Sequence, residues 1–261
     1  RLLLLPHGGN VELWDVASGR MQHEFDLSGR EAVFNPAGAR VVTVGLGERA
    51  QIWDVAGGRK LFDLPHTHRV RCATFRGDGR LLATGGDDQR VKVWNTADGR
   101  LLREFQGHTN RVLALAFTPA GGMLASGSAD GTFRFWDVHA GIEAARLIHL
   151  DRDVSGGEDW LIVTPEGLFD GSAWARSRVM YRVGGGLTVA PVDRFFQDFY
   201  RPGLLLEVLV GAKPLPEVPL DGAAPPEIRI VAPGGGAIDQ FEAVIEVEVK
   251  DSGGGVRGPW L

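Results

Sequence analysis

A segment of ten residues occurs four times in this chain, and this repetition limits the possible folds more than any other feature. The copies are VELWDVASGR, AQIWDVAGGR, VKVWNTADGR and FRFWDVHAGI. Their tryptophans are Trp14, Trp53, Trp94 and Trp136, which lie 39, 41 and 42 residues apart. A period of about 40 residues is typical of arrays in which each supersecondary unit is stabilised by its neighbours.

Turn signals keep the same period. Each tryptophan is followed five residues later by a glycine: Gly19, Gly58, Gly99 and Gly141. A glycine in phase with a strand predicts a tight turn with positive φ. A second turn precedes the last three tryptophans, at residues 35–38, 76–79 and 118–121.

The segments between these turns predict short strands. They are apolar or alternate between apolar and polar residues, at 41–44, 81–84, 91–94, 112–117, 123–126 and 133–136. One unit is therefore four antiparallel strands. A sheet of this size cannot bury its own faces, so we expect it to pack against the next copy.

The repeats resemble those of the WD-repeat β-propellers. In the fourth unit Gly107-His108 opens the repeat and Trp136-Asp137 closes it. The resemblance implies an all-β fold, a partial propeller of about four blades. It also implies an internal hydrogen-bonded tetrad in two units, formed by His66, Thr84, Asp88 and Trp94 in the third and by His108, Ser126, Asp130 and Trp136 in the fourth. In each tetrad the hydroxyl residue lies ten and the aspartate six residues before the tryptophan.

The other units depart from this pattern. The second has Thr43 at the hydroxyl position but Gly47 at the aspartate position and no opening histidine, so we expect a less rigid blade. In the first, Arg1-Leu2-Leu3 aligns with Arg80-Leu81-Leu82, which predicts that the chain begins at the second strand of a blade. Since closed propellers have about four to eight blades, we expect the chain to be a fragment of a larger protein.

The sequence changes character after the repeats. We predict blades over 1–150, a degenerate closing half-blade over 151–190, short aromatic helices over 191–211, a proline-rich linker over 212–227 and the start of an incomplete Ig-like β-sandwich over 228–261. Residues 204–210 fit a helix or a strand, and a helix is favoured.

This order of segments is similar to the junction in bacterial WD-repeat proteins that are fused to a caspase-like cysteine peptidase. The similarity covers residues 158–250 and includes the segment WLIVTPEGLFDGS from Trp160. It implies that a peptidase domain would follow Leu261.

Charge and cysteine content narrow the class of partner and compartment. The net charge is −5, the isoelectric point is about 5.8, and no basic stripe is present, so neither nucleic acid nor a membrane is expected as a partner. No segment has the length of a membrane span or a signal-peptide core. One cysteine, Cys72, forms no intrachain disulfide, which favours the reducing cytoplasm.

Few residues suggest catalysis. Cys72 has His66 and His68 nearby in the sequence, but it lies in a predicted strand and is interpreted as a small buried residue. Asp151–Gly156 imitates the start of a calcium loop, but Ile162 occupies the position of the bidentate glutamate. We therefore predict no catalytic residues, cofactor or bound metal.

The first functional hypothesis is a non-catalytic interaction scaffold for a protein or peptide partner. Arg69 and Arg111 follow the tetrad histidines at equivalent positions, and arginine is favoured in binding hot spots, so both are candidate partner-binding residues. Alternatives are a regulatory arm of a caspase-like peptidase and a propeller hydrolase. The hydrolase would need acidic or histidine side chains on the innermost strands.

Overall fold

The computed structural model describes residues 2–7, 10–25, 29–150, 159–178, 180–183, 189–191, 199–214, 227–230 and 247–250. Regular structure in these residues is almost entirely β-strand, which confirms the all-β fold class. The chain divides into two compact units. The first holds residues 1–129 and 136–142, and the second holds 130–135 and 143–261.

Antiparallel sheets of the predicted kind make up the first unit. The first sheet has β1 (Leu2–His7), β2 (Asn10–Asp15) and β3 (Arg20–Phe25) in that order. The second has β4 (Gly29–Phe34), β5 (Arg40–Gly45), β6 (Arg49–Asp54) and β7 (Lys60–Pro65). The third has β8 (Val70–Phe75), β9 (Leu81–Gly86), β10 (Val91–Asn95) and β11 (Leu101–Phe105).

The fourth repeat supplies β12 (Val112–Phe117), β13 (Met123–Ser128) and β14 (Thr132–Asp137). The strand order of its sheet is β12-β13-β14-β15-β16-β17, with β15 at Ile142–Leu150, β16 at Asp159–Val163 and β17 at Phe169–Gly171.

The predicted turns and register are present. The glycines that follow the tryptophans have φ values of 63° to 77°. Leu3 of β1 is paired with Trp14, just as Leu82 of β9 is paired with Trp94. β1 therefore occupies the second-strand position, which confirms the alignment of the first repeat with the third.

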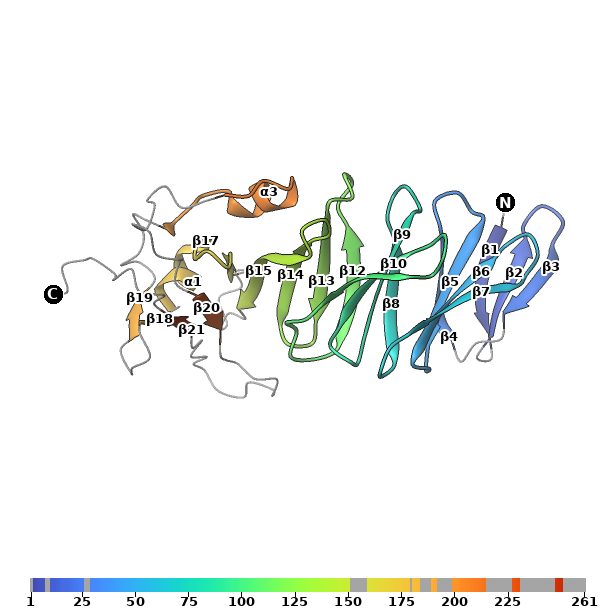
Figure 1. Ribbon diagram of the computed structural model, residues 1–261, viewed down its shortest axis with the longest axis horizontal. Helices are drawn as coiled ribbons and strands as arrows, with labels where there is room; N and C mark the ends of the chain where they lie inside the picture. Colours follow the sequence, from blue (N-terminus) through green and yellow to red (C-terminus); the bar gives the residue numbers. More distant parts are fainter. Residues whose placement is uncertain are drawn as a thin grey trace. The chain divides into compact units, whose positions relative to one another are not determined.

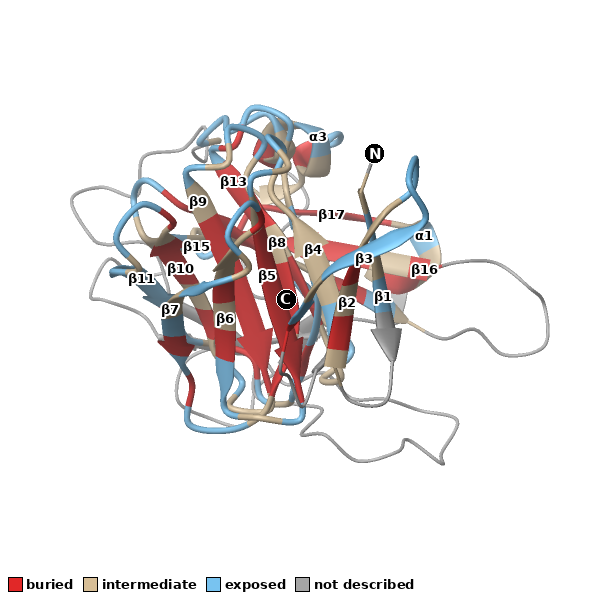
Figure 2. Ribbon diagram, turned by 90° about the vertical axis from the view of Figure 1, so that its right-hand side faces the viewer, coloured by how far each residue is buried: buried red, intermediate tan, exposed pale blue. Residues whose placement is uncertain are grey.

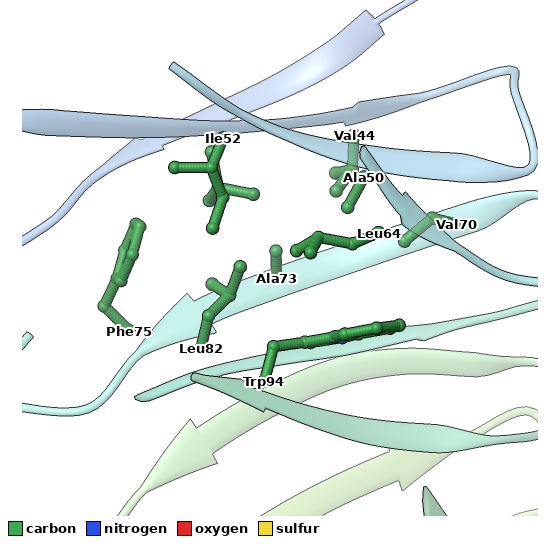
Figure 3. Close-up of a cluster of buried hydrophobic side chains, with 10 residues drawn as sticks. Val44, Ala50, Ile52, Leu64, Val70, Ala73, Phe75, Leu82 and Trp94 are labelled. Carbon is green, nitrogen blue, oxygen red and sulfur yellow. The ribbon is translucent and has the colours of Figure 1, made fainter. Parts of the chain in front are cut away.

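Neighbouring sheets of the first unit pack face to face. β5 lies against β8, and β8 lies against β12 (Figure 1). The core between the second and third sheets includes Ile52, Leu64, Leu82 and Trp94 (Figure 3). A second core joins the third repeat to the fourth, where Ala83, the residue after Leu82, faces the opposite way. The second and third sheets thus bury both faces against their neighbours, as the repeat predicted.

The second strand of each full sheet is the most buried, and the outer strand of the third sheet is the most exposed. All but the first residues of β5 and β9 are buried, whereas β11 is exposed except at Phe105 (Figure 2). An outer strand has fewer neighbours to cover its faces, so charged and polar residues are tolerated there.

The second unit contains shorter elements. They are α1 (Ala173–Arg178), β18 (Met180–Val183), β19 (Val189–Pro191), α3 (Leu204–Leu209), β20 (Glu227–Ile230) and β21 (Val247–Lys250). Strands β19, β18, β21 and β20 form one sheet in that order. The helix favoured for residues 204–210 is confirmed by α3, which buries Leu204 and Val208.

Contacts also hold α3 to β17. The backbone N–H of Gly203 donates to Asp170 Oδ2 at 2.8 Å, and the rings of Phe169 and Tyr200 lie 5.7 Å apart. The segment 151–156, which imitates the start of a calcium loop, and the aromatic residues Phe195 and Phe196 lie outside the described residues, as does most of the proline-rich linker. The domain boundaries after the repeats stay predictions.

Candidate functional site

The third repeat contains a continuous chain of hydrogen bonds that runs from Trp94 to Asp88. Trp94 Nε1 donates to Thr84 Oγ1 at 2.7 Å. His66 Nε2 lies 2.8 Å from the same hydroxyl oxygen, and His66 Nδ1 lies 2.7 Å from Asp88 Oδ2. When the imidazole carries its hydrogen on Nδ1, it donates to Asp88 and accepts from the Thr84 hydroxyl, so every polar atom in the chain has a partner. The structure thus brings together all four residues of this predicted tetrad.

The charge of Asp88 is stabilised by this arrangement. Burial of the carboxylate favours its protonated form, but the hydrogen bonds from His66 and from the backbone N–H groups of Arg90 and Thr67 outweigh burial. The pKa of Asp88 is therefore below its usual value. The ionised carboxylate fixes the histidine ring and, through it, the connection before β8.

Asp88→Asn is expected to destabilise the protein by about 1 kcal/mol at neutral pH, because a neutral hydrogen bond replaces a charge-assisted one. The pKa of Asp88 is lower in the folded state than in the unfolded state. The contribution of Asp88 to the free energy of unfolding is therefore complete at a pH above its pKa in the unfolded state. It is lost as the pH falls through its pKa in the folded state. Denaturant unfolding at several pH values should show the difference between the two proteins narrowing below about pH 4. A difference independent of pH would contradict this prediction.

The fourth repeat contains the same central contacts. Trp136 Nε1 donates to Ser126 Oγ at 2.8 Å, and His108 Nε2 lies 2.7 Å from that oxygen. Asp130 Oδ1 accepts two hydrogen bonds from Thr132 within the same turn, one from the backbone N–H at 2.9 Å and one from the Thr132 hydroxyl at 2.7 Å. The structure thus places His108, Ser126 and Trp136 together.

The first two repeats have reduced versions of this network. In the second, Trp53 Nε1 donates to Thr43 Oγ1 at 2.9 Å. In the first, the position ten residues before Trp14 is Leu4, and the indole instead donates to Glu12 Oε2 at 2.8 Å. The pairing with Glu12 was not predicted, although the apolar Leu4 signals that the usual acceptor is missing.

Arg69 and Arg111 lie at the same end of their sheets. The carbonyl of Arg69 accepts from Asp87 N at 2.8 Å, and the carbonyl of Arg111 accepts from Ala129 N at 3.0 Å. Arg69 Nε also donates to Gly45 O of the preceding sheet at 2.9 Å. We call the part of the molecule formed by segments 45–48, 66–69, 87–90 and 106–111 the loop end.

Sequence reasoning missed an ion pair at this loop end. Both Nε and Nη2 of Arg71 donate to the carboxylate of Asp87, and the second bond is 3.1 Å long. The hydrogen bonds from Arg71, together with the positive charges of Arg71, Arg69 and Arg111, hold the pKa of Asp87 below its usual value. Of these three arginines, Arg71 contacts the carboxylate directly, while Arg69 and Arg111 act on it through their charge.

A β-bulge explains the position of Arg71. The register of β8 against β9 shifts between Val70 and Cys72, and that of β12 against β13 shifts between Val112 and Ala114. Arg71 and Leu113 are the extra residues of these two bulges. A bulge turns one side chain out of the regular alternation, so it can present that side chain to a ligand.

Cys72 lies in β8 and is buried. Its Sγ is 3.6 Å from Gly85 O and 3.9 Å from Val112 O of the next repeat. Burial, followed by the negative charge of Glu31, raises the pKa of Cys72 to about 12. The thiol is therefore protonated at neutral pH, unlike the thiolate of a cysteine peptidase.

The Cys72 thiol should resist a disulfide reagent such as Ellman's reagent in the native protein and react fully in denaturant. The reason is that the reactive thiolate is scarce and Val112 covers the sulfur. Rapid stoichiometric labelling of the native protein would contradict the packing of the third repeat against the fourth.

The described part of the chain contains histidine, cysteine and carboxylate side chains and short helices. Within it, no group of three or more histidine, cysteine or carboxylate side chains is arranged to hold a metal ion. None of its helices combines the length and apolar character needed to span a bilayer.

Comparison with known families identifies the repeats. Residues 58–95 and 99–137 each match the family described as WD domain, G-beta repeat. The sheets that contain Trp94 and Trp136 are therefore WD-repeat sheets, and the fold is that of a partial WD-repeat propeller. No curated protein sequence matches the chain significantly.

The matched repeats are offset by one strand from the sheets. Residues 58–95 contain β7 of the second sheet and β8, β9 and β10 of the third. Each repeat thus supplies the outer strand of one sheet and the inner strands of the next. Because of this offset, the matched segment 58–95 passes from the second sheet to the third through the connection that carries His66.

Proposed function

We propose that this chain is a non-catalytic protein-interaction scaffold and that its loop end contacts the partner. WD repeats are characteristic of such scaffolds. The single observation that carries the assignment of the surface is the matched placement of Arg69 and Arg111 in successive repeats. Arginine is enriched in binding hot spots because its guanidinium combines charge, planarity and several donors.

The packing beneath the loop end supports this proposal. The His66–Asp88 contact fixes the connection before β8, and Arg69 joins the third sheet to Gly45 of the second. A preorganised surface loses little conformational entropy when a partner binds. The loops can therefore hold a fixed arrangement of side chains before contact.

Selection of binders from a displayed library of random peptides tests this function without assuming the chemistry of the partner. Enriched peptides should bind the purified chain, and Arg111→Ala should weaken that binding by about tenfold. Arg100→Ala is the matched control, since Arg100 is also exposed but lies in the turn at the opposite end of the third sheet. Failure to enrich any peptide, or equal effects of the two variants, would contradict the proposal.

A second candidate function is the regulatory arm of a caspase-like peptidase in a larger bacterial protein. It is supported by the order of segments in residues 158–250, which is similar to that of such fusions. On this proposal the protein works in the cytoplasm, where Cys72 remains reduced. A caspase-like domain with a cysteine and histidine pair, encoded after Leu261, would support it, and a stop codon there would exclude it.

The hydrolase alternative has less support. The innermost strands β8 and β12 carry Arg71 and Cys72 as their ionisable side chains, and the corresponding strand β4 carries one carboxylate, Glu31. A single carboxylate does not make a metal site, and no group of three or more histidine, cysteine or carboxylate side chains forms one within the described residues.

A further inference from the structure

We propose that the loop end of the third and fourth repeats binds a segment of a partner protein that carries clustered anionic side chains, carboxylates or phosphates. This inference rests on the proposed scaffold function and specifies the chemistry of the partner. Neither the family match nor the overall charge of −5 requires it.

The local charge at this surface is opposite to that of the whole chain. Asp87 bonds to the side chain of Arg71 and to the carbonyl of Arg69. The Sγ of Cys72, the residue after Arg71, lies 3.9 Å from the carbonyl oxygen of Val112, the residue after Arg111. Arg71 and Asp87 neutralise each other in a two-point ion pair. The loop end together with Arg71 holds four arginines and three carboxylates (Glu48, Asp87 and Asp88), which leaves a net charge of +1. Carboxylates and phosphates match the planar fork of a guanidinium, which makes them the preferred ligands of such a cluster.

Arg69 and Arg111 can still donate hydrogen bonds. Arg69 uses Nε to bind Gly45 O, which holds the guanidinium in place and leaves its terminal nitrogens for a ligand. Arg111 is exposed, and its side chain makes no hydrogen bond or ion pair to the described residues. The cluster thus combines one anchored cation with one free cation.

Exposed leucines flank the cluster. Leu46 is 55% exposed and lies between Gly45 and Gly47, whose carbonyls accept from Arg69 Nε and Val70 N. Leu113, the bulged residue after Arg111 and Val112, is 48% exposed. Apolar contacts beside charged groups exclude water from an interface and strengthen its ionic contacts.

A strained residue marks the same surface. Gln89 has a φ of 63°, and it is the only residue other than glycine with positive φ within the described part of the chain. The equivalent position of the fourth repeat, five residues before its tryptophan, is Gly131, with a φ of 81°. The backbone N–H of Gln89 donates to Gly86 O, and the Gln89 side chain is exposed in the same segment as Asp87, so it is available to a ligand.

Three fluorescein-labelled peptides test the inference by fluorescence anisotropy. They share one length and a leucine at each end, and differ in a central run of glutamates, phosphoserines or glutamines. We expect at least one of the two anionic peptides to bind about tenfold or more tightly than the glutamine peptide, and the stronger of them identifies the anion. Added salt should weaken this binding.

Variants at the loop end define the site. Arg111→Gln should lose about tenfold in affinity for the anionic peptide, Arg111→Lys should lose less because it retains the charge, and Arg100→Gln should bind as the wild type does. Gln89→Gly should keep or raise the thermal midpoint, since glycine adopts this φ freely, while binding falls about threefold. A gain in stability with unchanged affinity would remove Gln89 from the site.

The outcomes separate this inference from the scaffold function. Equal binding of all three peptides, or equal effects of the Arg111 and Arg100 variants on them, would overturn the anionic specificity. The scaffold function would still stand if library peptides without acidic residues depended on Arg111. Binding of a single-stranded oligonucleotide in place of the peptides, with the same dependence on Arg111, would also overturn the inference.

Discussion

Replacement of Trp94 by alanine should lower the free energy of unfolding by about 3–5 kcal/mol, because it removes a large buried aromatic side chain. The indole is 3% exposed and packs in the core between the second and third sheets, near Leu64 and Leu82 (Figure 3). The substitution also leaves the Thr84 hydroxyl without its donor. Denaturant unfolding monitored by circular dichroism measures the loss.

Trp53→Ala is the matched comparison. Its indole is only partly buried, and its partner Thr43 bonds to no histidine and aspartate pair. We therefore expect a smaller loss in the free energy of unfolding than for Trp94→Ala, because the substitution removes fewer packing contacts and interrupts a shorter hydrogen-bond network. Equal losses for the two variants would show that the His66–Asp88 extension adds no stability.

Gly86→Ala should destabilise the protein by about 1–3 kcal/mol, the usual cost of forcing extra atoms into a packed site. A Cβ at Gly86 would overlap the carbonyl oxygen of Arg69 and lie 3.0 Å from the Cα of Val70. Both obstacles are backbone atoms, so the clash is relieved only by moving β8 away from β9. The same unfolding measurement applies.

Gly77→Ala is the control for this prediction. Gly77 lies in the turn at the other end of β8, has no positive φ, and has open space where a Cβ would stand. The change should alter the unfolding free energy by no more than about 0.5 kcal/mol. Similar effects of the two substitutions would contradict the close approach of β8 and β9 at the loop end.

The positions of strands and turns were predictable because they follow from local chemistry that recurs with the repeat. Strand β12 spans the predicted residues 112–117, and the glycines of the turns have the positive φ that their spacing implied. The contacts of His66 with Thr84 and Asp88 also agree with their constant distances from Trp94.

Other contacts could not be predicted from spacing because they depend on irregularities of the backbone. The ion pair of Arg71 with Asp87 arises from a shift in the pairing register of β8 against β9. No residue type in β8 predicts that shift. Glu12 accepts from Trp14 only because its repeat lacks the usual hydroxyl. The strained φ of Gln89 likewise has no sequence signal, although the glycine at the same place in the fourth repeat is consistent with it.

By itself the sequence determined the repeating unit, the order of its strands and the need of each sheet to pack against another sheet. The alternation of apolar and polar residues and the turn residues are properties of short segments, and the period follows from their recurrence. Only the tertiary structure decided which side chains meet at the loop end. The pairing of β8 with β9 brings Arg69 and Asp87 together, and the packing of β12 against β8 brings Arg111 to the same end. A proposed binding surface built from several repeats is therefore visible only after the sheets have packed.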